Sequence, residues 1–321
     1  MTAATARPPR PLTPSAEFLA DALAGLRSPR KELPCKYFYD AAGSRLFDQI
    51  CDTPEYYPTR TELAIVRAHA GEMGALVGPN AVVIEYGSGS SVKTRYLLRH
   101  VPRPTAYVPV DISAEHLYHA AADLARRFPE VEVKPVAADF TKPFELPSFA
   151  SEVARRVVYF PGSTIGNFAP AAAAALLRGI AGLCGRGGGL LIGFDRKKDP
   201  TVLEAAYNDA AGVTAAFNLN LLARMNRELG ADFDVSAFRH RACYNSFAGR
   251  VEMHLVSLRD QTVRLAGNVI SFAAGETIHT ENSHKYAPDE FAALAARAGF
   301  RPVTAWADPA GYFGVQFFAV G

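Results

Sequence analysis

Glycines and acidic residues follow several apolar runs in the first half of the chain, a pattern typical of nucleotide-like ligands. Residues 85–91 (EYGSGSS) follow one such run, and Gly87 lets the backbone approach a ligand closely. Asp111 and Asp139 follow two further runs, and Phe140 comes directly after the second. A carboxylate can accept hydrogen bonds from both hydroxyls of an adenosine ribose, and an aromatic face suits the adenine ring. The pattern therefore predicts a cofactor that contains adenosine.

Two kinds of cofactor fit the glycine-rich turn. A dinucleotide site has the pattern G-x-G-x-x-G/A, and its third small position is occupied here by Val92. S-adenosylmethionine methyltransferases show an acidic residue and then G-x-G, which Glu85, Gly87 and Gly89 match. We therefore expect S-adenosylmethionine, with Lys93 placed to meet a carboxylate such as that of its methionine part. A dinucleotide-dependent oxidoreductase is the alternative from another class.

The loop at residues 161–168 contains a second candidate group, Asn167, which is followed by Phe168. This loop follows the apolar run at residues 156–160, which we expect to be the fourth strand of a parallel sheet. In a methyltransferase sheet, the loop after that strand faces the methyl group of the cofactor. A neutral amide can hydrogen-bond an amine without driving its protonation, as a carboxylate would. Asn167 is therefore a candidate for holding a nucleophilic amine.

Strands that alternate with helices must position these residues. Short apolar runs bounded by turn residues predict buried strands, and the segments between them predict helices. The expected strands are residues 81–85, 106–110, 131–138, 156–160 and 189–194, and the expected helices are 92–100, 113–128 and 171–184. This order predicts an α/β fold with a doubly wound, mostly parallel sheet that carries helices on both faces.

The alternation breaks between residues 196 and 286. The expected elements there are a helical region at 201–229, antiparallel strands at 251–258 and 262–266, and an irregular polar segment at 271–286. A helix at 288–298 and a strand at 313–320 then resume the pattern. We interpret residues 196–286 as an insertion that forms a cap with the aromatic-rich residues 15–60. Such a cap belongs at the carboxyl ends of the strands, where ligands bind in these sheets.

Composition excludes several classes of protein. Lys plus Arg is 34 and Asp plus Glu is 32, so the net charge of +2 does not indicate a nucleic-acid partner. No stretch approaches the roughly 20 apolar residues of a bilayer span, so we expect no membrane association. Residues 1–14 lack the apolar core of a secretory signal and predict a disordered tail. The 4 cysteines contain no C-x-x-C pair, which predicts reduced thiols, a cytoplasmic protein and no zinc site.

Five further segments have distinctive sequences. They are residues 36–40 (KYFYD), 54–62 (PEYYPTRTE), 162–167 (GSTIGN), 207–218 (YNDAAGVTAAFN) and 280–286 (TENSHKY). Through them the chain resembles the S-adenosylmethionine-dependent L-histidine Nα-methyltransferases of the ergothioneine pathway, which make hercynine, the trimethylbetaine of histidine. The resemblance extends from about residue 15 to the C-terminus. It implies a Rossmann-like sheet of the seven-stranded methyltransferase type and a second, smaller α+β substrate-binding domain.

The resemblance implies where the reacting amine lies. It places the carboxylate and amine of the substrate at Asn167 and Tyr207, with Tyr39 and Tyr56 lining the pocket of the amine and ring. We expect Tyr39 and Asn167 to be the catalytic residues. The trimethylated product is a cation without N–H groups, and aromatic faces bind such cations at roughly 0.5–2 kcal/mol each. Phe47, together with the two tyrosines, can supply these faces.

The resemblance also implies how the substrate ring is recognised. It assigns the imidazole to Glu281 and Ser283, with Met253 beside the ring. A neutral imidazole has one donor and one acceptor nitrogen, and the E-x-S spacing places a carboxylate and a hydroxyl on one face of an extended segment. The residues implied to bind S-adenosylmethionine are Gly87, Lys93, Asp111, Asp139 and Phe140.

These expectations define two domains and a small set of ligands. Residues 15–60 plus 196–286 are expected to bind the substrate, and residues 61–195 plus 287–321 are expected to bind the cofactor. The partners are L-histidine and S-adenosylmethionine, which leaves as S-adenosylhomocysteine, with no metal. We expect a monomer.

Two more alternatives keep this fold. One is an enzyme with the same cofactor that methylates another aromatic or indole amino-acid amine, and the other is a non-catalytic S-adenosylmethionine-binding module. Glu281 and Ser283 disfavour both, because neither protein needs an imidazole pocket.

Overall fold

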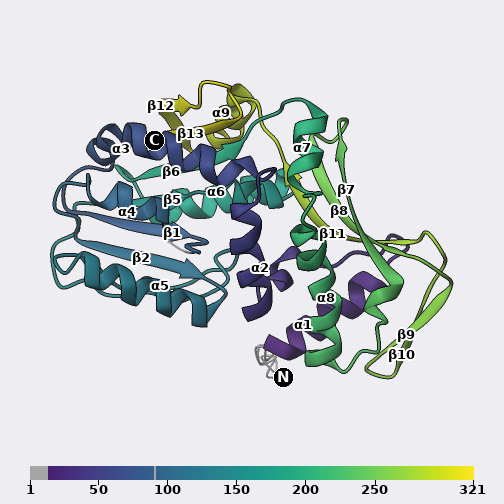
Figure 1. The fold of residues 1–321 in the computed structure, drawn as a ribbon. Helices are drawn as coiled ribbons and strands as arrows, with labels where there is room; N and C mark the ends of the chain where they lie inside the picture. The colour runs from purple at the N-terminus through teal and green to yellow at the C-terminus, as the bar shows by residue number, and fades with distance from the viewer. Residues whose placement is uncertain (1–13, 90–91) are drawn as a thin grey trace, which may run out of the picture.

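The computed structural model describes residues 14–89 and 92–321, which form two lobes that lie side by side (Figure 1). One lobe contains a large sheet covered by helices on both faces. The other contains a smaller sheet, a hairpin and the N-terminal helices. The predicted tail at residues 1–14 lies outside the described residues except for Pro14, which begins the first helix.

The large sheet has eight strands in the order β12-β13-β6-β5-β1-β2-β3, with β4 paired to β2. Its central strands are parallel, whereas β12 and β13 are antiparallel to their neighbours. The strands are β1 (Ala81–Tyr86), β2 (Ala106–Asp111), β3 (Glu132–Val133), β4 (Val136–Ala137), β5 (Arg155–Phe160), β6 (Gly189–Asp195), β12 (Phe300–Ala307) and β13 (Phe313–Val320). The predicted α/β fold with a mostly parallel sheet is confirmed.

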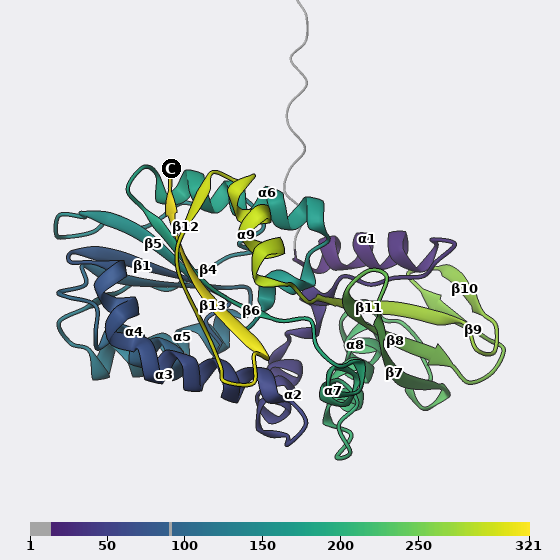
Figure 2. The ribbon, with the colours of Figure 1, turned by 90° about the horizontal axis from the view of Figure 1, so that it is seen from above.

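Helices cover both faces of this sheet (Figure 2). They are α3 (Tyr57–Val77), α4 (Val92–Leu98) and α5 (Ala114–Arg127) on one face, and α6 (Pro170–Cys184) and α9 (Pro288–Ala296) on the other. Along β1, Val82 and Ile84 pack toward α6 and α9, whereas Val83 packs toward α3 and α4. Because side chains of a strand alternate between faces, a continuous apolar run such as this one becomes buried on both sides.

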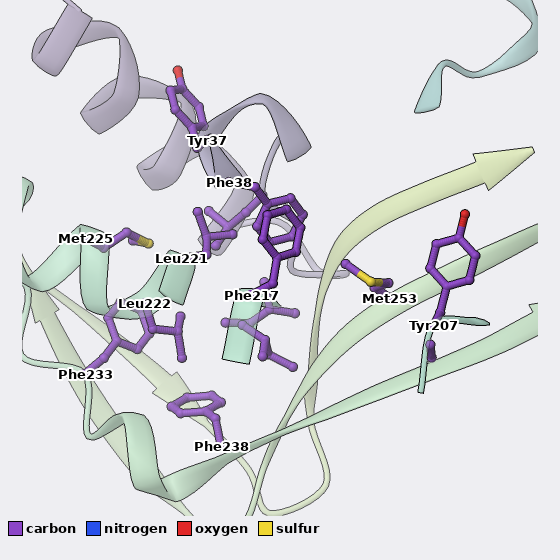
Figure 3. Close-up of a cluster of buried hydrophobic side chains, with 14 of the residues drawn as sticks. Tyr37, Phe38, Tyr207, Phe217, Leu221, Leu222, Met225, Phe233, Phe238 and Met253 are labelled. Carbon is purple, nitrogen blue, oxygen red and sulfur yellow. The ribbon is translucent and has the colours of Figure 1, made fainter. Parts of the chain in front are cut away.

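The smaller lobe is built from two separate parts of the chain. Its elements are α1 (Pro14–Leu26), η1 (Cys35–Phe38), α2 (Ala41–Asp52), α7 (Pro200–Ala206), α8 (Val213–Leu229), η3 (Val235–Ala237), β7 (Phe238–Asn245), β8 (Arg250–Ser257), β9 (Gln261–Leu265), β10 (Asn268–Phe272) and β11 (Thr277–His284). One apolar core joins both parts, and in it Phe38 packs on Phe217 of α8 with ring centroids 4.5 Å apart. Figure 3 shows this core around α8.

Several predicted elements of the smaller lobe are confirmed. The helical region at 201–229 forms α7 and α8, and Gly212 precedes α8 with a φ of 74° that favours glycine. The strands expected at 251–258 and 262–266 correspond to β8 and β9.

Other predictions about local structure were wrong. Residues 271–286 are not irregular, because β10 ends within them and β11 pairs with β8 from Thr277 to His284. Polar residues occupy both faces of β11, which hid the alternation that reveals most strands. Residues 131–138 form two short strands rather than one, and Pro135, which has no N–H for the sheet, lies between them. Strands β7, β10 and β12 were not predicted.

The two lobes meet where η2 (Thr164–Asn167) packs on β11. Gly166 is the closest point of this contact. A Cβ atom on Gly166 would lie 2.7 Å from the carbonyl oxygen of His284 and 3.2 Å from its backbone nitrogen. Only glycine therefore allows the loop that carries Asn167 to lie directly against the end of β11.

We predict that Gly166→Ala separates these two segments and lowers the free energy of unfolding by about 1–3 kcal/mol. Chemical denaturation measures the loss. The control is Gly182→Ala in α6, where an added Cβ meets no atom within 4 Å and a helix gains up to about 1 kcal/mol from alanine. Equal stability of Gly166→Ala and the wild type would show that the contact is not tight.

Candidate functional site

A large cleft of about 1280 Å³ lies between the two lobes. Where β1 ends, Gly87 and Gly89 have positive φ values of 70° and 46°, and added Cβ atoms there would meet nothing closer than 4.0 Å. The glycine turn is thus open toward a ligand. All five residues predicted to bind the cofactor line this cleft, namely Gly87, Lys93, Asp111, Asp139 and Phe140.

The acidic residues of the cleft lie at the carboxyl ends of neighbouring strands. Asp111 ends β2 and accepts a hydrogen bond from the backbone N–H of Ser113 at 2.9 Å. Burial raises the pKa of Asp111, and this N–H opposes the rise. Asp139 follows β4, and the adjacent Phe140 stacks on Tyr86 with ring centroids 4.9 Å apart. A carboxylate and a supported aromatic face are therefore available where the sequence predicted an adenosine.

Lys93 has a partner that the sequence did not predict. Its ammonium bonds the buried carboxylate of Glu62 in α3, which also accepts a hydrogen bond from the backbone N–H of Gly162 at 2.8 Å. The ion pair joins α3, α4 and the loop after β5. Lys93 still lines the cleft, but its charge is largely balanced by Glu62.

A small cavity opens from the same cleft. Its lining includes all eight residues predicted to bind the substrate, namely Tyr39, Phe47, Tyr56, Asn167, Tyr207, Met253, Glu281 and Ser283. Tyr39, Phe47, Tyr56, Asn167 and Glu281 also line the large cleft. A ligand in the small cavity would therefore lie next to a ligand in the cleft.

Aromatic rings form one wall of the small cavity. Phe47 contacts Tyr39 at 5.7 Å and Tyr56 at 6.3 Å between ring centroids, and Tyr56 contacts Tyr207 at 6.1 Å. All three contacts are edge-on, so none of these rings is stacked face to face on its neighbour. Among the residues that the structure describes, the hydroxyls of Tyr39 and Tyr56 and the amide of Asn167 have no hydrogen-bond partner.

The polar wall of the cavity comes from β11. Glu281 and Ser283 are two residues apart, so their side chains lie on the same face of the strand. Burial raises the pKa of Glu281 to about 7, and the positive charge of Lys285 opposes the rise. Within the described part of the chain the carboxylate of Glu281 accepts no hydrogen bond, which leaves it available to a donor on a ligand.

A buried ionic cluster adjoins this wall. Asp195, which ends β6, accepts hydrogen bonds from Tyr57, Lys198 and Lys285. Burial alone would raise the pKa of Asp195, but the two lysines outweigh it and hold the pKa below its usual value. Lys285 also donates to the hydroxyls of Tyr207 and Ser283, at 3.0 and 2.9 Å.

The chain is similar to known proteins over nearly its whole length. The model of a family described as histidine-specific, SAM-dependent methyltransferases matches residues 18–320. The chain belongs to this family. It is 46% identical over 302 residues to the histidine N-alpha-methyltransferase of Mycolicibacterium smegmatis, with 92% of each chain covered.

The chain is also similar, at lower identity, to two fungal proteins. The chain is 29% identical to ergothioneine biosynthesis protein 1 of Neurospora crassa, over 86% of this chain and 32% of that protein. It is 28% identical to the 4-dimethylallyltryptophan N-methyltransferase easF of Epichloe festucae var. lolii, over 88% of this chain and 89% of that protein.

Sequence reasoning missed several residues at this site. Phe217 and Thr214 of α8 and Asp195 line the small cavity, and Lys285 lies behind it. Lys285 could have been found from the alternation in β11, because it continues the series of Glu281 and Ser283 at a spacing of two. Asp195 directly follows the strand expected at residues 189–194, but nothing in the sequence indicated its role.

One group of possible metal ligands occurs among the described residues, away from both cavities. Ligand atoms of Cys243, Glu252 and His254 lie within 4.8 Å of one another. However, Arg250 and Asn245 both donate to Oε1 of Glu252, at 2.8 and 3.0 Å, and a guanidinium repels a cation. The arrangement indicates a surface hydrogen-bond network, and the expected absence of a metal stays a prediction.

The raised pKa of Glu281 predicts a pH-dependent cost to stability. A carboxyl whose pKa rises from 4.5 to about 7 on folding holds its proton more tightly in the folded state. The stability of the ligand-free protein therefore falls as pH rises from about 4.5 to 7. Glu281→Gln removes this loss and should be more stable than the wild type by about 1–3 kcal/mol at pH 8, with a much smaller gain near pH 5.

Urea unfolding at both pH values measures the difference. The substitution Glu130→Gln, at an exposed position outside both cavities, is the control. If the gain of Glu281→Gln were the same at both pH values, Glu281 would not titrate in this range.

Proposed function

We propose that the protein methylates the α-amino group of L-histidine three times, with S-adenosylmethionine as the donor and hercynine as the product. The observation that carries the proposal is the junction of the two cavities. The residues expected to bind histidine line one cavity, those expected to bind the cofactor line the other, and Asn167 lines both. The family of the chain and its 46% identity to a histidine N-alpha-methyltransferase support the same substrate.

The residues of the large cleft fit S-adenosylmethionine. Asp111 can accept hydrogen bonds from the ribose hydroxyls, Asp139 from the adenine amine, and Phe140 can pack against the base. Gly87 leaves room for the methionine part beside Lys93. The bound cofactor supplies an electrophilic methyl group on sulfur.

Asn167 and Tyr207 would hold the amine and carboxylate of histidine. Alignment of the amine with the methyl group can lower the barrier of an in-line displacement by several kcal/mol. The amine must be neutral to react, and an amide side chain does not stabilise its ammonium form as a carboxylate would. Tyr39 lines both cavities, and its hydroxyl is the candidate to accept a hydrogen bond from the amine and so to direct the amine lone pair toward the methyl group. Burial raises the pKa of Tyr39 well above its usual value, so the hydroxyl keeps its own proton and the proton that the amine loses passes to water.

The aromatic wall accounts for continued reaction after the first transfer. Each added methyl group removes an N–H donor, so hydrogen bonding to the amine weakens from round to round. The faces of Tyr39, Phe47 and Tyr56 attract a methylated ammonium independently of its N–H groups. The wall therefore favours retention of the partly methylated intermediates.

The imidazole would lie between Glu281 and Ser283, with Met253 beside the ring. A site built to pair both ring nitrogens rejects rings that lack them by a large factor. This pair disfavours the alternative of an indole amine, because an indole has a single nitrogen, which can only donate.

We further propose that the two lobes bind different ligands. Residues 15–60 plus 196–286 bind the substrate, and residues 61–195 plus 287–321 bind the cofactor. A single apolar core joins Phe18 with Ile278, which supports the first unit. Among the described residues no helix is long and apolar enough to cross a membrane. We propose a cytoplasmic monomer that needs neither a metal nor a nucleic acid.

Incubation with S-adenosylmethionine and each free amino acid tests the proposed function. Mass spectrometry should show gains of one, two and three methyl groups on L-histidine. Methylation of tryptophan or tyrosine with histidine left unchanged would contradict the proposal.

We predict that Asp111→Ala weakens S-adenosylmethionine binding at least tenfold, because the ribose hydroxyls lose a charged acceptor. Isothermal titration calorimetry measures this affinity. The control Asp123→Ala removes a carboxylate of α5 that pairs with Arg95 outside the cleft, and it should bind the cofactor normally. Unchanged affinity in Asp111→Ala would remove Asp111 from the cofactor site.

A further inference from the structure

Lys285 lies behind the small cavity, where no part of a ligand reaches it. Its side chain is 0% exposed. Its three N–H groups each have an acceptor, since Asp195 Oδ2 lies at 2.8 Å, Ser283 Oγ at 2.9 Å and the Tyr207 hydroxyl at 3.0 Å. No donor of the ammonium remains for a substrate, so Lys285 can act only through these neighbours.

The hydrogen bonds around Ser283 have a defined direction. Its oxygen accepts one bond from Lys285 and a second from the Tyr207 hydroxyl at 2.8 Å. A serine hydroxyl has two acceptor positions and one hydrogen. Because both acceptor positions are taken, Ser283 can offer a ligand only its hydrogen.

Glu281 offers the opposite polarity two residues earlier on the same face of β11. Its carboxylate has no hydrogen-bond donor among the described residues and lines the small cavity. When it is ionised it can only accept. The polar wall therefore presents one acceptor and one donor, and a neutral imidazole presents the complementary N–H and lone pair.

We propose that Lys285 determines the ring specificity of the small cavity by fixing Ser283 as a hydrogen-bond donor. The inference rests on the proposed function. Lys285 is a positioning residue, because it acts on the substrate only through Ser283. It selects one neutral tautomer of histidine, in which the ring N–H faces Glu281 and the unprotonated nitrogen faces Ser283. A ring with C–H in place of the bare nitrogen leaves the Ser283 hydrogen unpaired.

The surroundings keep Lys285 in its donating form. Burial disfavours the charged ammonium, but the carboxylate of Asp195 outweighs this effect and holds the pKa of Lys285 above its usual value. Lys198 bonds the other oxygen of Asp195 and the Tyr57 hydroxyl. Asp195 therefore keeps a cationic partner even when Lys285 is replaced.

The test compares histidine with two analogues, pyrrol-2-ylalanine and pyrrol-3-ylalanine. Each analogue keeps one ring N–H and replaces the other nitrogen by C–H. Wild-type protein should prefer histidine over the better analogue by at least tenfold in kcat/KM, because the analogue leaves the Ser283 hydrogen unpaired. In Lys285→Met the Ser283 hydrogen can turn toward the freed Tyr207 oxygen, so this preference should fall about tenfold.

Lys198→Met is the matched control. It removes the other lysine of Asp195 but no partner of Ser283, so the preference should stay within twofold of wild type. Calorimetry of S-adenosylmethionine binding checks that each variant is folded, since Lys285 and Lys198 lie outside the lining of the large cleft. If Lys285→Met fails to fold, Tyr207→Phe replaces it. This variant frees one acceptor position of Ser283 and should also lower the preference.

The outcomes separate this inference from the proposed function. The inference alone would be overturned if Lys285→Met methylates histidine and keeps the wild-type preference for histidine over the analogues. The same outcome in Tyr207→Phe would overturn it where that variant replaces Lys285→Met. A similar fall in Lys198→Met would also overturn it, because the effect would then come from the charge cluster as a whole. Failure of the wild-type protein to methylate histidine would overturn the proposed function and the inference with it.

Discussion

A buried negative charge, that of Asp195, connects the large sheet to the wall of the small cavity. Its carboxylate ends β6 and receives hydrogen bonds from α3, from the segment after β6 and from the end of β11. A buried charge destabilises a protein strongly unless it is paired, so these four segments must keep their relative positions for the fold to be stable. The geometry of the cavity therefore depends on the buried ion pairs of Asp195 with Lys198 and Lys285. Tyr207 and Ser283 are ordered from behind before any ligand arrives.

The sequence predicted the large lobe well because its strands are buried on both faces. Continuous apolar runs such as β1 carry a strong signal, and the glycines and acidic residues at their ends lie where a parallel sheet requires them. The smaller lobe was harder to predict. Strand β11 has polar residues on both faces, because one face lines a cavity and the other carries residues such as His284. A functional surface inside a fold thus removes the pattern by which strands are recognised.

In the site, too, some residues could be predicted from the sequence and others could not. Every residue predicted to bind a ligand lines one of the two cavities, and most of these residues lie in or beside a distinctive local motif. The partners that orient these residues were missed. Glu62 meets Lys93 across 31 positions of sequence, and Asp195 meets Lys285 across 90. An isolated Glu or Lys has no sequence pattern that identifies a contact of this length, which only the packed structure creates.

The contact of Gly166 with the backbone of His284 has a consequence for substrate length. It packs the loop of Asn167 against the strand of Ser283, so the groups expected to hold the two ends of the substrate are held close together. The distance between the groups expected to hold the amino group and the ring then depends on the packing of two backbone segments against each other. An amino acid with one methylene more or fewer than histidine would reach only one of these anchoring points at a time.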